Sequence, residues 1–285
     1  MDAPKVLDFH NAYINGDDKK LDWLWCHETP KSLIKFSHGK YNSDGSNYFL
    51  EGIQGSTLWL SSPRCFNDPF DSVINFDYYA ETLKLSKEIL DKWVGNDSAE
   101  RILQSEKGGE LLERCIERIR LEFEENHRVI EKSIYSACFS EFENLYSLRM
   151  WGHYADNHSG VCAEYDFKAV NDACEFGCIP IRYTNSYEYL INARNMSESV
   201  RNFLKLYTKA TEWEHEKEWR VSKQLSGGEK IGVSIPFVFP RKVYLGCRVK
   251  EKLKSDVMAF CADRDIEIYQ MKLKPGSFCL DYEKI

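Results

Sequence analysis

The sequence has no apolar run that approaches the ~18–20 residues needed to cross a bilayer, so no membrane-spanning helix is expected. It also has no recognisable secretory leader, because residues 1–16 are polar and mixed in charge. No internal repeat and no low-complexity linker divides the 285 residues. We therefore expect a cytoplasmic protein without a membrane partner, folded as a single domain over residues 1–285.

The ten cysteines include no Cys-x-x-Cys pair, the spacing most often found in metal-binding sites. Cys174 and Cys178 are four residues apart, but no matching ligand pair lies near them in the sequence. His153 and His158 are separated by a five-residue step, which does not place them on one helical face. We therefore predict no metal site, and cysteines that are reduced and mostly buried.

The chain lacks an excess of positive charge, since its formal net charge is −7. This argues against a surface covered with basic residues for nucleic acid. Residues 241–254 are an exception, because they hold six cationic residues and one acid and leave −12 for the rest of the chain. The segment is interpreted either as a solvated helix face or as a patch for a phosphate-bearing substrate or target.

Apolar periodicity predicts a mixed α+β fold. The predicted strands are at residues 21–26, 57–60, 134–139, 160–167, 179–183, 218–223, 242–245 and 267–271. The predicted helices are a short one through residues 33–36, an acidic helical insertion at about 80–132, and others at 144–154, 186–214 and 250–263. Because strands and helices do not alternate regularly, we expect a split, partly antiparallel sheet rather than a doubly wound one.

A histidine and a threonine follow the first predicted strand. His27 and Thr29 are two residues apart, so on an extended segment their side chains point to the same side. Together they could hydrogen-bond ribose hydroxyls or an amide. The alternative is a turn in which Thr29 caps a helix that begins at Pro30.

The loop over residues 61–71 contains two prolines and the sequence Asn-Asp-Pro-Phe. Asn and Asp side chains readily bond to nearby backbone groups, which predicts a shaped turn. The same loop could present Arg64 and Asn67 to a phosphate or an amide.

Two aromatic residues are three apart on a predicted helix. Trp151 and Tyr154 would share one helical face and could clamp a flat ring. The alternative is an aromatic pair packed into the core.

A row of acids lies near a late strand. On an extended segment Glu214, Glu216, Glu218 and Arg220 would lie on one side, and like carboxylates in a row repel unless a cation or a substrate offsets them. The plain interpretation is a row of surface salt bridges. The alternative is a carboxylate site, since a carboxylate facing a cleft can bind a ribose hydroxyl and stabilise an oxocarbenium-like cation.

Four blocks resemble the successive motifs of a large bacterial family described only as a domain of unknown function. In sequence order they are TLWLSSP, FNDPFD, MWGHYADNHSGVC and EKEWR. Their layout is also similar to that of ADP-ribosyltransferases of the diphtheria-toxin-like and DNA-modifying toxin type. This second resemblance implies a sheet of ADP-ribosyltransferase type.

In those enzymes a His-x-Thr on the first strand holds NAD⁺, aromatic residues stack on nicotinamide, and a glutamate on a late strand is catalytic. The resemblance therefore implies that His27 and Thr29 bind NAD⁺ and that Glu218 is catalytic, with Glu216 in a supporting role. The other residues that it implies for NAD⁺ binding are Arg64, Asn67, Trp151 and Tyr154.

The implied activity is transfer of ADP-ribose from NAD⁺ to a macromolecule, without a metal. The cationic segment at 241–254 makes RNA or DNA slightly favoured over protein as the acceptor. The resemblance also implies a toxin of a bacterial toxin–antitoxin or phage-defence system, with an antitoxin protein as a partner. The alternatives are an NAD⁺ glycohydrolase, in which water is the acceptor, and a non-catalytic nucleotide- or partner-binding module.

Overall fold

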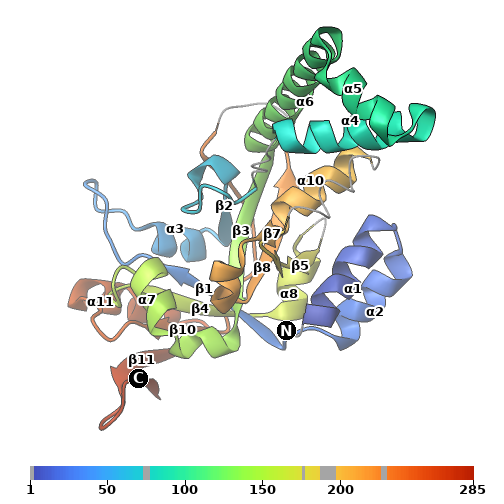
Figure 1. Ribbon diagram of the computed structural model, residues 1–285. Helices are drawn as coiled ribbons and strands as arrows, with labels where there is room; N and C mark the ends of the chain where they lie inside the picture. Colours follow the sequence, from blue (N-terminus) through green and yellow to red (C-terminus); the bar gives the residue numbers. More distant parts are fainter. Residues whose placement is uncertain (1–2, 73–77, 175–176, 187–196, 226–229) are drawn as a thin grey trace.

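A mixed ten-stranded sheet forms the centre of the fold, and helices cover it (Figure 1). The computed structural model describes residues 3–72, 78–174, 177–186, 197–225 and 230–285. The strands of the sheet are β1 (Ser32–Ser37), β2 (Thr57–Ser61), β3 (Ile134–Glu141), β4 (Val161–Asp166), β5 (Cys178–Pro180), β8 (Glu218–Gln224), β9 (Gly232–Pro236), β10 (Lys242–Leu245), β11 (Glu267–Leu273) and β12 (Leu280–Lys284). A separate two-stranded sheet pairs β6 (Arg182–Tyr183) with β7 (Thr208–Lys209).

The α-helices lie before, between and after these strands. They are α1 (Ala3–Ile14), α2 (Asp18–His27), α3 (Tyr48–Gln54), α4 (Tyr78–Val94), α5 (Asn96–Gln104), α6 (Glu106–Ser133), α7 (Leu148–Tyr154), α8 (Phe167–Asp172), α10 (Glu198–Leu206) and α11 (Glu251–Cys261). Short 3₁₀ helices are η1 (Pro63–Cys65), η2 (Phe142–Tyr146) and η4 (Thr211–Glu216).

The strand order is β12-β11-β10-β4-β1-β3-β2-β9, while β8 pairs with β3 and β5 pairs with β8. Among the pairs of this sheet, β10 and β11 run parallel and the others are antiparallel. The predicted α+β class with a partly antiparallel sheet is therefore confirmed.

The sheet divides along one edge of β3. Strand β8 pairs with β3 along nearly its whole length, so β1 and β2 share the opposite edge. Strand β1 meets β3 at Ser140 and Glu141, whereas β2 meets it at Ser136. Between these two contacts, Lys35 of β1 donates its Nζ to the carbonyl oxygen of Cys138 at 3.1 Å. A charged side chain thus lies at the point where the sheet splits.

Both faces of the sheet are covered, which explains the burial pattern of β1. Leu33 packs into the large cluster that includes residues of α1, α2, α3 and α11. The next residue, Ile34, points to the other face and packs with Trp151 of α7. Because successive side chains of a strand point to opposite faces, both residues are buried and β1 shows no clean alternation of polar and apolar residues.

The predicted helical segment at about 80–132 is confirmed as α4, α5 and α6. In Figure 1 these helices extend away from the sheet. Helix α6 begins at the cap residue Ser105, whose hydroxyl accepts the N–H of Gly108 at 3.1 Å, and it leads directly into β3.

Two predictions near the N-terminus are wrong. Residues 21–26 belong to helix α2, because Asp17 caps it by accepting the N–H of Lys20 at 3.0 Å and because Leu21 and Leu24 bury one helical face. The predicted short helix at 33–36 is instead β1, which pairs with β3 and β4 on its two sides.

Other predicted elements are confirmed, shortened or divided. The strands at 57–60, 134–139, 160–167, 218–223, 242–245 and 267–271 correspond to β2, β3, β4, β8, β10 and β11, and the helix at 250–263 to α11. The helix at 144–154 is divided into η2 and α7 at Ser147, which caps α7, and the strand at 179–183 is divided into β5 and β6. Of the predicted helix at 186–214, residues 187–196 lie outside the described ranges, and 198–206 form α10 before β7 and η4. Strands β9 and β12 and helices α1, α3 and α8 were not predicted.

No helix in the described ranges is long and apolar enough to cross a membrane. All ten cysteines are free thiols. Three are buried, four are half-buried and three are exposed, so the expectation that most are buried was too strong.

Candidate functional site

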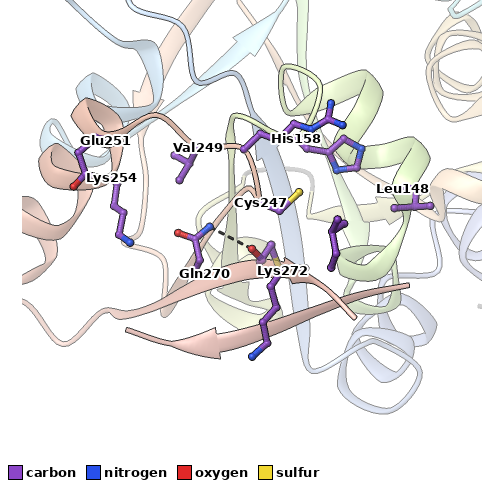
Figure 2. A pocket seen from close by; sticks show the side chains of 11 residues that line it. Leu148, His158, Cys247, Val249, Glu251, Lys254, Gln270 and Lys272 are labelled. Atoms are coloured by element: carbon purple, nitrogen blue, oxygen red, sulfur yellow. Dashed lines mark hydrogen bonds between the residues drawn. The ribbon is translucent and has the colours of Figure 1, made fainter. Parts of the chain in front are cut away.

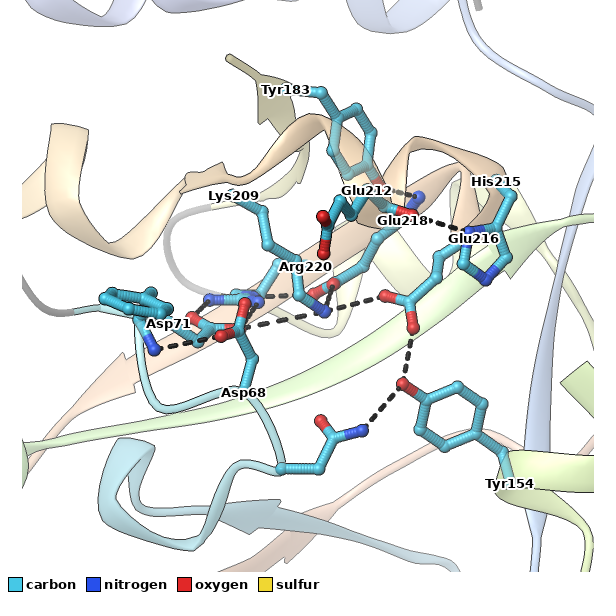
Figure 3. A network of polar contacts seen from close by, with 12 residues as sticks. Asp68, Asp71, Tyr154, Tyr183, Lys209, Glu212, His215, Glu216, Glu218 and Arg220 are labelled. Carbon is cyan, nitrogen blue, oxygen red and sulfur yellow. Dashed lines mark hydrogen bonds and ion pairs between the residues drawn. The ribbon is translucent and has the colours of Figure 1, made fainter. Parts of the chain in front are cut away.

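Two places in the described ranges are candidates for a functional site. One is a cavity beside the ends of β10 and β11 (Figure 2). The other is a buried polar network around β8 (Figure 3), which contains two of the predicted acids. We call it the Glu218 network, and its members are Asn67, Asp71, Tyr154, Lys209, Glu216, Glu218 and Arg220.

Arg220, in β8, is the most deeply buried residue of the network. Its side chain is 0% exposed, and its two terminal nitrogens donate to the two carboxylate oxygens of Asp71, each at 2.9 Å. Its Nε donates to Oε1 of Glu218 at 2.7 Å, and Nη1 also donates to the carbonyl oxygen of Leu206 at 2.6 Å. Every nitrogen of this guanidinium therefore has a partner, as a buried cation requires.

Lys209 joins the two glutamates. Its Nζ donates to Oε2 of Glu216 at 2.7 Å and to Oε2 of Glu218 at 3.3 Å, and it lies 3.8 Å from Oδ2 of Asp71. The ring of Trp213 lies 4.8 Å from the same nitrogen. The side chains of Lys209 and the two glutamates are at most 4% exposed. One cation thus offsets the repulsion between two buried carboxylates.

Tyr154 and Asn67 form the outer end of the network. The hydroxyl of Tyr154, at the end of α7, donates to Oε1 of Glu216. The side-chain amide of Asn67 donates to the same hydroxyl at 3.2 Å (Figure 3). Asn67 is exposed and Tyr154 is half-buried, so the network runs from the protein surface to the fully buried Arg220.

A sharp turn of the backbone places the two glutamates. Helix η4 ends at Glu216, Lys217 has a left-handed φ of 44°, and β8 begins at Glu218. The side chain of Asn144 donates to the carbonyl oxygen of Glu216 at 2.6 Å. The hydroxyl of Tyr183 accepts the N–H of Glu218 at 2.8 Å. These bonds hold the turn so that both carboxylates meet Lys209.

The surroundings of Glu218, Lys209 and Tyr154 shift the pKa of each side chain. Burial alone would raise the pKa of Glu218, but Arg220 and Lys209 outweigh it and lower this pKa to about 2. Burial alone would lower the pKa of Lys209, but the carboxylates of Glu218 and Glu216 raise it. Burial, reinforced by the charge of Glu216, raises the pKa of Tyr154. Glu218 is therefore a carboxylate, Lys209 an ammonium and Tyr154 a neutral phenol.

A carboxylate with such a low pKa is a poor general acid or base, since proton transfer works best when the pKa lies near the operating pH. It is suited to stabilising positive charge and to accepting hydrogen bonds. An ionised carboxylate has about four acceptor sites. Among the described residues, Arg220, Lys209 and the thiol of Cys138 use three of those on Glu218, which leaves one acceptor site for a further donor.

His27 and Thr29 do not lie on the first strand, contrary to the prediction. His27 ends helix α2, where its Nδ1 lies 2.8 Å from the carbonyl oxygen of Trp23 and its ring stacks on that indole. The hydroxyl of Thr29 donates to the carbonyl oxygen of Trp25 at 2.9 Å, so it ends a helix rather than beginning one. The first strand is β1, and it carries Lys35.

Of three other predicted positions, those of Trp151 and Glu214 differ from the expectation, whereas Arg64 lies exposed in the predicted loop. Trp151 is 0% exposed and donates its indole N–H to the carbonyl oxygen of Leu145 at 2.7 Å, so its ring has no face for a ligand. Arg64 is exposed on η1. Glu214 is exposed on η4, because the segment before Glu218 is helical rather than extended.

Sequence reasoning missed two cations of the site. Lys209 lies on a two-residue strand, and nothing in its local sequence distinguishes it from other lysines. Lys35 was assigned to a helix, but from β1 it is close enough to Glu218 to interact with its charge. Burial lowers the pKa of Lys35. Asp71 and Arg220 were present in the quoted blocks FNDPFD and EKEWR, and opposite charges in two such blocks were a signal for their pairing.

In the described ranges no group of three or more His, Cys, Asp or Glu side chains is placed to hold a metal ion.

Comparison with known proteins gave one family. A search of curated proteins and a search of solved structures each returned no match. Residues 150–221 match a family described as "Protein of unknown function (DUF2971)", a stretch that runs from α7 into β8 and contains Tyr154, Lys209, Glu216, Glu218 and Arg220. This part of the chain is thus similar to a domain family of unknown function.

Proposed function

We propose that the protein cleaves NAD⁺ and transfers its ADP-ribose to a macromolecule, with Glu218 as the carboxylate that stabilises the transition state. One observation carries the proposal: Glu218 is held ionised beside Glu216 and retains capacity for a further hydrogen bond. Breaking the bond between ribose and nicotinamide develops positive charge on the sugar. A fixed anion can stabilise that charge without a change of protonation state.

The balance of the reaction follows from this role. The bond between the anomeric carbon and the nicotinamide nitrogen breaks, and its electron pair leaves with neutral nicotinamide. A nucleophile of the acceptor then bonds to the anomeric carbon and loses its proton. The remaining acceptor site of Glu218 would bind a ribose hydroxyl in this state. Glu216 supports the reaction by sharing Lys209 with Glu218.

The residues proposed for NAD⁺ binding change from those expected at first. The ADP-ribosyltransferase resemblance implies a binding pair on the first strand, and β1 carries Lys35 and Ser37 two residues apart, with their side chains on the same side. We propose them in place of His27 and Thr29, with Lys35 as the contact to a phosphate. Tyr154 is proposed as the aromatic contact in place of the buried Trp151.

We propose the acceptor and the biological setting on the basis of the ADP-ribosyltransferase resemblance. RNA or DNA is favoured over protein because of the cationic segment at 241–254. A toxin of a toxin–antitoxin or phage-defence system, with an antitoxin partner, fits the same resemblance.

The proposal is tested by incubating the protein with NAD⁺ labelled in the adenylate part, together with separate pools of RNA, DNA and protein. Label should join one pool with the wild type and with Glu214→Gln, which makes the same chemical change at an exposed carboxylate of η4. Glu218→Gln should abolish the transfer. Label released only as free ADP-ribose would identify a glycohydrolase. Failure of the wild type to bind NAD⁺ in calorimetry would favour the non-catalytic binding module.

A further inference from the structure

A cavity of about 500 Å³ lies where the parallel strands β10 and β11 end, beside the start of α11 (Figure 2). Its volume is in the range of small-molecule sites, roughly 300–1,000 Å³. The strand–helix–strand unit β10-α11-β11 directs the carboxyl ends of both strands toward it. In open α/β sheets, ligands bind beyond the carboxyl ends of parallel strands. We call this site the β10–β11 cavity.

Cationic side chains dominate the charged part of its wall. Arg248, Lys254 and Lys272 line it, and Glu251 is the acid among the lining residues. Lys272 is paired with Glu283 at 2.7 Å. Among the described residues, neither Arg248 nor Lys254 has an ion-pair partner. These two cations belong to the segment whose positive charge stood out in the sequence, and they favour an anionic ligand.

The rest of the wall suits a flat, partly polar ring. Val249 and Leu273 supply apolar surface. The side-chain nitrogen of Gln270 donates to the carbonyl oxygen of Gly246 at 2.9 Å, and its amide oxygen accepts from no residue in the described part of the chain, so it can accept from a ligand. Apolar surface, one amide acceptor and two cations together match a base joined to a phosphate.

The turn behind the cavity contains three consecutive residues with positive φ. Asp156, Asn157 and His158 have positive φ values of 49°, 52° and 70°, and such conformations cost about 1 kcal/mol or more each for residues other than glycine. The carbonyl oxygen of His158 accepts the N–H of Arg248 at 2.9 Å. A Cβ on Gly246 would lie 2.2 Å from that same oxygen, so only glycine allows this contact. The turn therefore fixes the backbone that carries Arg248.

We propose that the β10–β11 cavity binds a nucleotide, either free or as a unit of a nucleic-acid strand. Arg248 and Lys254 contact its phosphate, and Val249 and Leu273 contact its base. The inference goes beyond the proposed reaction and does not require it, because none of these residues belongs to the Glu218 network. Helix α7 connects the two sites, since Leu148 at its start lines the cavity and Tyr154 at its end bonds to Glu216.

The test is a binding titration of the full chain with ADP and with a short single-stranded oligothymidylate. Arg248→Gln and Lys254→Gln should each weaken binding about tenfold, the usual effect of losing a hydrogen bond to a charged group. Lys274→Gln is the matched control, because it removes the same charge one residue beyond the lining. Glu251→Gln should tighten binding about two- to threefold by removing a like charge beside the phosphate.

The outcomes distinguish a free nucleotide from a nucleic-acid strand as the ligand, and the β10–β11 cavity from the Glu218 network as the binding site. Tighter binding of ADP identifies a free nucleotide, whereas tighter binding of the oligonucleotide, with a steep salt dependence, identifies a strand. Lys35, the phosphate contact proposed for the NAD⁺ site, distinguishes the two sites: Lys35→Gln should leave either affinity unchanged, and a loss as large as that of Arg248→Gln would place the probes at the Glu218 network and overturn the proposal. The proposal is overturned if neither probe binds, or if Arg248→Gln and Lys274→Gln weaken binding equally.

Discussion

The carboxylate of Asp71 and the guanidinium of Arg220, 149 residues apart in the chain, form a two-point ion pair at 2.9 Å. Asp71 belongs to the loop after β2, and Arg220 lies in β8, so the pair ties that loop to the interior of the sheet. The same guanidinium uses its Nε to orient Glu218. Stability and the proposed chemistry therefore depend on one buried cation.

Asp71→Asn should lower the free energy of unfolding by about 3–5 kcal/mol, because it leaves the charge of Arg220 buried without its full partner. Denaturant unfolding measures this change. Glu283→Gln is the control, since it breaks the exposed pair with Lys272 and should change stability little. A loss for Asp71→Asn as small as that of the control would contradict the prediction.

The low pKa of Glu218 predicts an acid-dependent loss of stability. A carboxyl group whose pKa falls from 4.5 to about 2 on folding stabilises the protein above the unfolded value. That contribution, roughly 3 kcal/mol, is lost as the pH falls from about 5 to about 2. The slope of unfolding free energy against pH should be shallower in this range for Glu218→Gln, and an unchanged slope would refute the assignment.

His10 predicts a second pH effect at milder acidity. Burial lowers its pKa from 6.5 to about 4, its Nε2 lies 3.0 Å from the carbonyl oxygen of Pro180, and its Nδ1 has no partner among the described residues. The unfolded chain binds a proton at a higher pH than the folded protein, so stability falls as the pH drops from about 6.5 to about 4. His10→Gln keeps a donor for Pro180 and should remove this dependence, as thermal unfolding at several pH values would show. Equal pH dependence in the variant and the wild type would count against it.

Trp151 and Tyr154, three residues apart on α7, should respond in opposite ways to substitution by Phe. Trp151→Phe removes a buried hydrogen bond and some core volume, so it should lower stability by about 2 kcal/mol and leave the rate per folded molecule unchanged. Tyr154→Phe removes the hydroxyl between Asn67 and Glu216. It should lower the rate of NAD⁺ cleavage more than it lowers stability. Parallel unfolding and rate measurements decide, and a reversed order would exclude Tyr154 from the site.

Much of the fold was predictable where a single pattern decided an element. Helices α4 to α6 follow from their amphipathic periodicity, and strands such as β2 and β10 are short apolar runs. Strand β1 was missed because Leu33 and Ile34 are buried on opposite faces of a doubly covered sheet. Helix α2 was missed because its cap, Asp17, lies outside the run that resembled a strand.

The candidate site was predictable in its carboxylates but not in its partners. Spacing grouped Glu216 and Glu218 with Glu214, and the resemblance singled out the first two. Both meet Lys209, although a left-handed turn rather than a continuous strand brings them together. The role of Lys209 depends on β7 and η4, whose positions only the tertiary structure determines. The binding pair that the resemblance implies on the first strand was assigned to His27 and Thr29 because β1 had not been identified as that strand.

The central claim is that the ionised carboxylate of Glu218 stabilises positive charge on NAD⁺. The measurement that tests it most directly is the rate of nicotinamide release at saturating NAD⁺ for the wild type, Glu218→Gln and Glu214→Gln, each confirmed as folded by its thermal unfolding. We predict a loss of about 10²-fold or more for Glu218→Gln, the size expected for a lost transition-state contact, and no change for Glu214→Gln. A folded Glu218→Gln protein that releases nicotinamide as fast as the wild type would contradict the account.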